Sequence, residues 1–242
     1  MLAYRPKIHY NITMNYYNYN NYNRPYQKLG ATEIFIIING ILFLPFFFRG
    51  FPLFRELFKF TRYFLSMNIG YSDVPCFDRW ALWQPLTAMF MHGSMTHIFF
   101  NMYALYIFGK PLEMRWGTKR FASFYLTVGI LANIAGGLIF ILTGRPLSLI
   151  GASGAVYGVL LGYGSLYPDS RLLLFFFIPI KVKWCVLLYA AIEVISEIYS
   201  VADGIAHSVH LFGFLFAFFY IMIFMHRNAV KDMFFKDDVE II

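Results

Sequence analysis

Charged residues are scarce in this chain, and their scarcity excludes an ordinary soluble domain. Of the 242 residues, 14% are charged and 59% are hydrophobic, whereas about 25% of the residues of a soluble domain are charged. Basic residues in a membrane protein mostly mark its cytoplasmic loops, so a net charge of +7 does not indicate a nucleic-acid partner. We therefore expect a protein of the lipid bilayer that binds no nucleic acid.

Cysteines are also scarce, and the first residues are not expected to be a cleavable signal peptide. The two cysteines, Cys76 and Cys185, are too few for a disulfide framework, and both are expected to be unpaired thiols. The first 30 residues are rich in tyrosine and asparagine and contain no apolar core of a signal peptide. Residues 1–30 are predicted to form a disordered cytoplasmic tail, with weak affinity for the membrane interface as the alternative.

Apolar runs recur along the rest of the chain and predict an all-α, polytopic membrane protein with six spanning helices. A span needs about 20 residues, within a range of about 17–25. The fourth run is short and glycine-rich, which favours a helix packed inside the others. A long loop at 49–94 mixes basic residues with phenylalanine and leucine, as an interfacial helix does, and is expected to be partly embedded. The six runs lie at 31–48, 95–112, 121–143, 151–167, 182–200 and 205–225.

The distribution of basic residues predicts the orientation of these helices. The tails and the loops on their side carry fourteen lysines and arginines, and the other side carries six. Cytoplasmic loops are enriched in these residues, so both termini are expected in the cytoplasm. The expected location is a bacterial inner (plasma) membrane, and residues 226–242 are expected to form a short cytoplasmic tail.

Ser153 stands out because it lies among small residues in an apolar run. The surrounding stretch is LIGASGAVYG, in which Gly154 and Gly158 form a G-x-x-x-G pattern. By itself this pattern indicates close helix packing, with the serine hydroxyl bonded to the carbonyl one turn back. A packing role is therefore the alternative to a chemical one.

Polar side chains from two other predicted helices converge at the depth of Ser153. His97 and Asn101 are four residues apart, so they share one face near the outer end of the second helix. His210 lies about 9 Å into the sixth helix from the same side, at 1.5 Å per residue. Ionisable groups inside a membrane are unfavourable and usually functional, which predicts a shared site in the outer leaflet.

Together these groups can perform nucleophilic catalysis. A serine hydroxyl is a weak nucleophile until a base removes its proton, so we predict Ser153 as the nucleophile and His210 as the base. The predicted oxyanion donors are the backbone N–H of Ser153, at a helix start, and the side chains of His97 and Asn101. Tyr157, one turn below Ser153, is expected to stack under the His210 ring.

No carboxylate is expected beside the base. Asp203 lies seven residues before His210, about 10 Å along the helix, and Asp169 lies near the opposite membrane side on this topology. The sequence therefore predicts a Ser–His dyad in which packing and Tyr157 orient the imidazole ring.

His207 is the alternative base, three residues before His210. We prefer His210 because Gly213 follows it by three residues, and a small residue one turn below the base lets the sixth helix approach Gly154 and Gly158. His207 would lie about 4.5 Å nearer the outer surface, and it is expected to face water or the loop.

The combination of motifs resembles the rhomboid intramembrane serine proteases over roughly residues 31–225. GASG at 151–154 resembles the nucleophile motif of that family, and HLFG at 210–213 resembles its H-x-x-G motif. HGSMTHIFFNM at 92–102 resembles its H-x-x-x-x-H-x-x-x-N segment, while WALWQPLTAMFMHGS and LEMRWG at 112–117 fit the surrounding pattern. The resemblance implies a rhomboid-like membrane protease domain at 31–225.

The resemblance also implies roles for single residues. Ser153 is then the nucleophile, His210 the base, and His97 and Asn101 oxyanion-hole side chains. His92 is implied to be a structural or water-holding residue near the loop. Other residues given a supporting or structural part are Gly151, Gly154 and Tyr157 around the nucleophile, and Glu113 and Arg115, which would tie the second helix to its loop.

Three positions in the sixth predicted helix depart from the family pattern. Val209 stands where alanine usually precedes the base, Phe212 stands in place of a glycine after it, and Ala217 stands in place of a later glycine. Phe212 is expected to tighten or tilt the packing near the dyad, which affects substrate fit more than catalysis.

The predicted function is an intramembrane serine endopeptidase that cleaves transmembrane-anchored proteins near the outer membrane boundary, without a metal or cofactor. A catalytically silent rhomboid-like protein that binds membrane clients is the alternative. A metal-dependent enzyme or a transporter could use His92, His97, His207 and His210 as ligands. Against these readings, the sequence has no H-E-x-x-H motif, no intramembrane aspartate pair and no repeated halves.

Overall fold

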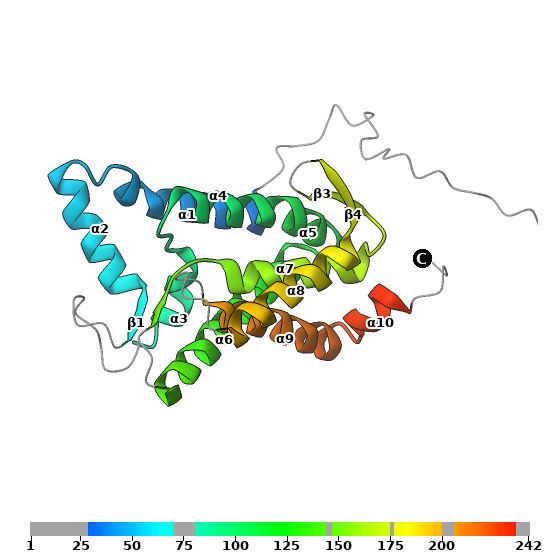
Figure 1. Ribbon diagram of the computed structural model, residues 1–242. Coiled ribbons are helices and arrows are strands. Elements are labelled where there is room, and N and C mark those ends of the chain that lie inside the picture. Colours follow the sequence, from blue (N-terminus) through cyan, green and yellow to red (C-terminus); the bar gives the residue numbers. More distant parts are fainter. Residues whose placement is uncertain (1–28, 70–80, 144–146, 175–176, 200–205, 236–242) are drawn as a thin grey trace, which may run out of the picture.

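Helices occupy all six ranges in which apolar runs predicted them. The computed structural model describes residues 29–69, 81–143, 147–174, 177–199 and 206–235, and Figure 1 shows how the elements are arranged. The second predicted helix is continuous but changes its winding, because a π-helical stretch lies within it. The six are α1 (Ala31–Phe47), α4 (Met95–Ala104) continued by η2 (Leu105–Gly109) and α5 (Lys110–Trp116), α6 (Thr118–Thr143), α7 (Ser153–Leu166), α8 (Val182–Ile198) and α9 (His207–Phe224).

Among the described residues, two helices are long and apolar enough to cross a bilayer by length and composition. They are the Thr118–Ile139 part of α6 and the whole of α9, with mean hydropathies of 1.7 and 1.8. Helix α1 is apolar but shorter, and α7 has 14 residues, fewer than the roughly 17 that a span needs. The number of six spans therefore stays a prediction.

The predicted all-α architecture is incomplete, because two short antiparallel strand pairs are present. Strand β1 (Met67–Ile69) pairs with β2 (Leu147–Leu149) and joins the long loop to the segment before α7. Strands β3 (Arg171–Leu174) and β4 (Ile178–Lys181) pair between α7 and α8. Runs of three or four residues are too short to show a strand period in the sequence, so the apolar pattern did not predict them.

Helix α7 lies at the centre of the bundle, as its small residues predicted. It packs against α6, α8, α9 and α10, and Figure 1 shows it between α4 and α5 on one side and α6 and α9 on the other. Ten of its 14 residues are buried. A helix this short is stabilised mainly by packing against its neighbours, because short helices are only marginally stable by themselves.

Glycines bring α7 and α9 into backbone contact. A Cβ at Gly213 would lie 2.1 Å from the carbonyl oxygen of Gly154, and a Cβ at Gly158 would lie 3.3 Å from the carbonyl oxygen of Gly213. The first of these spaces cannot hold a side chain, because the opposing atom belongs to backbone. The predicted approach of Gly213 to Gly154 and Gly158 is confirmed, and it brings the starts of the two helices together.

The long loop contains the predicted helix, α2, which forms an arm beside the bundle (Figure 1). Helix α2 (Pro52–Leu65) contacts α1 and α3 (Gln84–Thr87), and a 3-10 turn, η1 (Ala88–Phe90), follows α3. Apart from its contacts at the two ends, α2 leaves most of its described side chains exposed or half-buried. Its position in the membrane interface stays a prediction.

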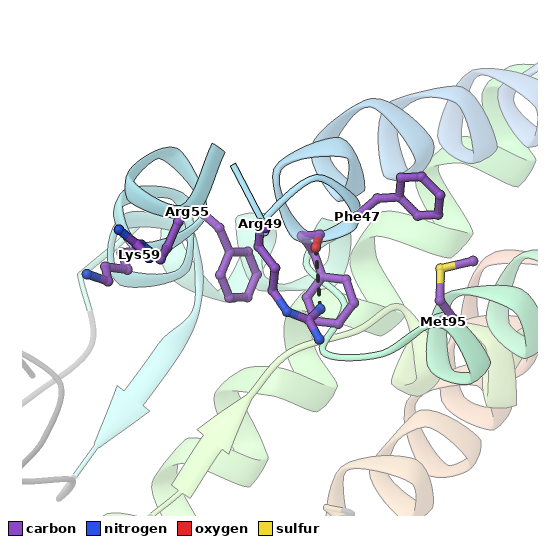
Figure 2. Close-up of a pocket in the computed structure, with 8 residues that line it drawn as sticks. Phe47, Arg49, Arg55, Lys59 and Met95 are labelled. Atoms are coloured by element: carbon purple, nitrogen blue, oxygen red, sulfur yellow. Dashed lines mark hydrogen bonds between the residues drawn. The ribbon is translucent and has the colours of Figure 1, made fainter. Parts of the chain in front are cut away.

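An open hollow separates the carboxyl end of α1 from α2. Figure 2 shows Phe47 on α1, Met95 on α4 and Arg55 on α2 around it. Arg49 lies over the ring of Phe46, 4.0 Å from its centroid, and its guanidinium donates to the Phe46 carbonyl oxygen at 3.3 Å. The hollow is therefore lined by aromatic rings and basic groups together.

Glu113 caps the start of α1 and does not simply tie the second helix to its loop. Its carboxylate oxygens accept hydrogen bonds from the backbone N–H groups of Ala31 and Thr32, at 2.6 and 3.1 Å. Amides in the first turn of a helix lack intrahelical partners and favour a nearby negative charge. This buried carboxylate therefore fastens α1 to the second helix.

The carboxyl end of the described chain packs back on the bundle. Helix α10 (Ala229–Phe234) lies in the range predicted as a short tail, and Ala229 and Met233 on it are buried. A Cβ at Gly164 of α7 would lie 2.9 Å from the sulfur of Met233. The predicted disorder of residues 1–30 falls almost wholly outside the described residues.

Candidate active site

Helix α7 begins at Ser153, directly after a tight backbone turn. Gly151 has a φ of 111°, a conformation that residues with a side chain rarely adopt, and its N–H donates to the Ala88 carbonyl oxygen at 2.8 Å. The first four amides of an α-helix have no partner within it. The start of α7 can therefore offer backbone donors beside the Ser153 hydroxyl.

The Ser153 side chain meets His210 from α9. The hydroxyl oxygen of Ser153 lies 2.7 Å from Nε2 of His210, and the histidine is buried. The expected stacking of Tyr157 is present: its ring lies 4.4 Å from the His210 ring, with 8° between the two planes. Stacking on one face and a hydrogen bond at Nε2 leave the imidazole little freedom to rotate.

Helix α4 and the segment just before it bring three polar side chains to the same place, His97 and Asn101 on the helix and His92 before it. A Cβ at Gly151 would lie 2.5 Å from Nε2 of His97 and 3.7 Å from Nδ2 of Asn101, so both side chains face the turn before Ser153. Asn101 donates from Nδ2 to the His97 carbonyl oxygen at 3.1 Å and lies 3.3 Å from Nε2 of His92. His92 is buried, and its ring contacts the His97 ring at 4.8 Å.

A carboxylate does lie beside the candidate base, contrary to the sequence prediction. Glu193, on α8, places one oxygen, Oε1, 3.0 Å from Nδ1 of His210. The same oxygen accepts a short hydrogen bond from the Tyr157 hydroxyl. Glu193 is only 4% exposed. A simple Ser–His pair oriented by packing and Tyr157 is therefore an incomplete description of the site.

His207 is also placed differently from the prediction. It is buried, with 7% of its surface exposed, and its Nδ1 lies 2.6 Å from Oε2 of Glu193. The expectation that His207 faces water is wrong, because its side chain is buried and meets Glu193 where α8 contacts α9. The alternative, that it faces the loop before α9, concerns residues 200–205, which lie outside the described residues.

The two aspartates considered from the sequence do not take this position. Asp169 pairs with Lys181 and Lys183, at 2.8 and 3.0 Å, in the connection between α7 and α8. Hydrogen bonds from these ammonium groups hold the pKa of Asp169 below its usual range. Asp203 lies outside the described residues.

One signal in the sequence could have identified Glu193. It is an ionisable residue within the predicted span 182–200, and such residues usually face the interior of a bundle and mark a function. Spacing alone does not reveal the rotation of α8 about its axis, so the sequence does not show that Glu193 faces α9.

The departures from the family pattern on α9 fill space around the helix contact. The methyl groups of Val209 pack beside Gly136 and Gly154, and the methyl group of Ala217 packs beside Gly158. Phe212 stacks on Phe216 at 6.0 Å and joins a cluster around Met67 and Leu149. Phe212 therefore packs against a small apolar cluster that contains Val209 of its own helix as well as Met67 and Leu149 of the two strands.

In the described part of the chain, three side chains that could bind a metal ion lie close together. Glu193, His207 and His210 each have one ligand atom within 4.8 Å of the others. In the same described residues, the four histidines considered from the sequence do not form such a group.

Comparison with known proteins identifies the family. The model of the Rhomboid domain matches residues 79–227, which include α4, α7, α8 and α9. The mouse (Mus musculus) presenilin-associated rhomboid-like protein, mitochondrial, is 29% identical over 144 residues, which cover 56% of this chain and 36% of that protein. Rhomboid-like protease 3 of Toxoplasma gondii is 28% identical over 135 residues, covering 55% of this chain and 43% of that protein.

A bacterial relative shares a shorter segment. Rhomboid protease GluP of Bacillus subtilis (strain 168) is 37% identical over 78 residues, which cover 32% of this chain and 14% of that protein. The chain spans less than half the length of each of these three relatives. Since the family model matches more than half of the chain, this protein belongs to the rhomboid family, which comprises multi-pass membrane proteins.

Proposed function

We propose that the chain is an intramembrane serine endopeptidase that cleaves membrane-anchored proteins near the outer membrane boundary. The observation that carries the proposal is the 2.7 Å contact between the Ser153 hydroxyl and Nε2 of His210, because it joins a nucleophile to a base. The names of two relatives, Rhomboid-like protease 3 and Rhomboid protease GluP, support the same class of reaction.

The proposed first step is acylation of Ser153. Nε2 of His210 removes the hydroxyl proton while the serine oxygen attacks the peptide carbonyl. The imidazolium then gives that proton to the leaving amine, and the carbonyl carbon stays bonded to the serine oxygen. Water, activated by the same histidine, hydrolyses the acyl-enzyme and restores both groups.

The proposed oxyanion site lies between α4 and the start of α7. His97 and Asn101 face Gly151, and α7 begins two residues later, at Ser153, with first amides that lack partners within the helix. Donors that are already in place stabilise a developing negative charge without reorganisation. Side-chain and backbone donors from two helices would therefore share the oxyanion.

The substrates proposed are proteins with a single membrane span that has helix-destabilising residues near the outer boundary. Both termini of the enzyme are proposed to face the cytoplasm, from the distribution of lysine and arginine. The expectation of a bacterial inner membrane is not supported, because similar proteins include a mitochondrial one from mouse.

The test is cleavage of a fluorescent single-span reporter by purified protein in lipid vesicles. Ser153→Ala and His210→Ala should each lower kcat by about 10⁴-fold or more, and a fluorophosphonate probe should label the wild type but not Ser153→Ala. Ser165→Ala is the matched control: this hydroxyl is buried on the same helix and donates to the Gly162 carbonyl oxygen at 2.8 Å. It should cleave at the wild-type rate.

Two results would contradict the proposal. Full cleavage by Ser153→Ala would remove the serine from the mechanism. A wild type that binds the reporter and resists the fluorophosphonate probe, without cleavage, would instead indicate the client-binding alternative.

A further inference from the structure

We propose that Glu193 is a positioning residue for the base, so that the reacting unit is Ser153–His210–Glu193 with His207 and Tyr157 holding the carboxylate. The inference rests on the proposed protease function and adds a residue to its site. It comes from the three side chains that converge on one buried carboxylate between α7, α8 and α9.

The order of atoms through the site is continuous. The Ser153 hydroxyl contacts Nε2 of His210 at 2.7 Å, and Nδ1 of the same ring lies 3.0 Å from Oε1 of Glu193. The Nδ1 contact is close but is not aligned as a hydrogen bond in this structure. Such bonds in free enzymes are often poorly aligned and become ordered when the substrate binds.

The carboxylate determines which ring nitrogen of His210 carries the proton. An ionised carboxylate can only accept hydrogen bonds, so the nitrogen that faces Glu193 must be the one that bears hydrogen. Nε2 then keeps its lone pair toward the Ser153 hydroxyl, which is the tautomer that a general base requires. No other group in the described part of the chain hydrogen-bonds to Nδ1, so the carboxylate is the group there that can select this tautomer.

The interaction also becomes stronger during the reaction. When the proton of Ser153 moves to Nε2, His210 becomes an imidazolium and Glu193 stays ionised, so an ion pair replaces a charge beside a neutral ring. Glu193 is 4% exposed, and opposite charges attract more strongly where water is excluded. A contact that is stronger in the transition state than in the ground state accelerates the chemical step.

Two further side chains hold the carboxylate in this orientation. His207 meets Oε2 through Nδ1 at 2.6 Å, and the Tyr157 hydroxyl donates to Oε1. Tyr157 also stacks on His210, so one residue fixes both the ring and the carboxylate. Oε1 of Glu193 therefore meets Tyr157 as well as the base, and Oε2 meets His207.

The same three groups could reach one metal ion, but their spacing favours direct contact. Two ligand atoms at about 2.0–2.1 Å from a tetrahedral zinc ion are roughly 3.3 Å apart. Nδ1 of His207 and Oε2 of Glu193 are 2.6 Å apart, and Nδ1 of His210 and Oε1 are 3.0 Å apart. Both distances are shorter than this separation, so they suit direct contact between each pair of groups.

The experiment compares substitutions at Glu193 in full-length protein in vesicles, with kcat and KM measured separately. Glu193→Gln keeps the size of the side chain and removes its charge, and it should lower kcat by about 10²–10⁴-fold with KM nearly unchanged. Glu193→Asp restores the charge and should recover at least about tenfold of that loss. Glu197→Gln is the matched control, because Glu197 is exposed one turn further along α8, and it should leave kcat unchanged.

His207→Gln provides an independent test if the Glu193 variants fail to fold. It removes one partner of the carboxylate without touching the base, so kcat should fall about tenfold at unchanged KM. A purely structural role would change the unfolding temperature or KM and would not restore kcat when aspartate restores the charge.

Several results would overturn the inference. It would be overturned if folded Glu193→Gln cleaves at the wild-type rate, or if the Gln and Asp variants have equal kcat values. A wild-type kcat in His207→Gln would also overturn it. Loss of wild-type cleavage on treatment with EDTA or 1,10-phenanthroline would replace it with a metal site. The failure of the protease function itself is distinguished by Ser153→Ala: if that variant still cleaves, the function is wrong, whereas cleavage lost there but kept in Glu193→Gln removes the role of Glu193 alone.

Discussion

Helices α7 and α9 touch each other through their backbones, whereas the arm formed by α2 exposes large side chains. At the α7–α9 contact, Gly154 and Gly213 allow one backbone to touch the other. On α2, large apolar side chains such as Leu53 and Phe60 are 75% and 59% exposed and meet little of the protein. Glycines fix the α7–α9 contact because they let the two backbones meet, whereas α2 exposes its side chains to the surroundings of the protein.

The difference follows from what each region has to position. Reacting atoms must be held to within fractions of an ångström, and backbone contact between two helices has few ways to relax. An interfacial helix needs only to keep its apolar face in lipid and its basic groups near the headgroups. We therefore expect changes at the α7–α9 contact to act in any environment, and changes on α2 to act mainly in a bilayer.

The largest expected effect in this comparison is that of Gly213→Ala. Its methyl group would lie 2.1 Å from the Gly154 carbonyl oxygen, so α9 must move away from α7. Overpacking of this kind destabilises a protein by about 1–3 kcal/mol, and a shift of about 1 Å at the reacting atoms lowers activity about 100-fold. Thermal unfolding and reporter cleavage, in both micelles and vesicles, measure the two effects.

Gly40→Ala on α1 is the control for that substitution. A Cβ at Gly40 meets nothing within 4 Å, and alanine is favoured over glycine within a helix by about 0.5–1 kcal/mol. The variant should keep full activity and be equally or slightly more stable. Equal behaviour of the two alanine variants would show that backbone contact does not position the site.

Loss of the α4 side chains should have a smaller effect than a shift of the backbone. His97→Ala and Asn101→Ala each remove one proposed oxyanion donor, and each should lower kcat about 10- to 100-fold, below the loss of about 10²–10³-fold known for a single essential donor, because the amides of α7 remain. The unfolding temperature should change little for His97→Ala. If the double variant cleaves at the wild-type rate, the two side chains serve packing only.

The sequence predicted well what depends on periodicity and small residues. The six helices, the burial of α7 and the approach of Gly213 to Gly154 all follow from apolar runs and glycine spacing. Depth along each helix also brought Ser153 and His210 to the same level, and they are in contact. These features depend on distance along a helix axis, which residue number gives directly.

What the sequence missed depends on rotation and on short segments. Glu193 and His207 meet because α8 turns the Glu193 carboxylate toward α9. An apolar helix with two glutamates, Glu193 and Glu197, contains no pattern that shows which of them faces α9. The prediction that His207 faces water failed for the same reason. The strand pairs were missed because β1 and β2 are three residues long and distant in sequence, so their pairing is visible only in the folded chain.

The smallest expected effect is that of changes on the apolar side of α2, and it depends on the surroundings. Leu57 and Phe60 lie three residues apart, so they share a face of the helix, and they are 42% and 59% exposed. Because they pack on little of the protein, Leu57→Gln with Phe60→Gln should leave the unfolding temperature in micelles within about 2 °C, as for surface substitutions within about 0.5 kcal/mol. In vesicles the arm loses part of its apolar anchor, at about 1.5–3 kcal/mol for each large side chain fully removed from lipid, and cleavage should fall a few-fold.

Glu56→Gln, on the same helix and already exposed, should change neither measurement. An equal loss of activity in micelles and vesicles would mean that α2 acts by contact with the bundle, and the contrast with the α7–α9 contact would then be one of degree.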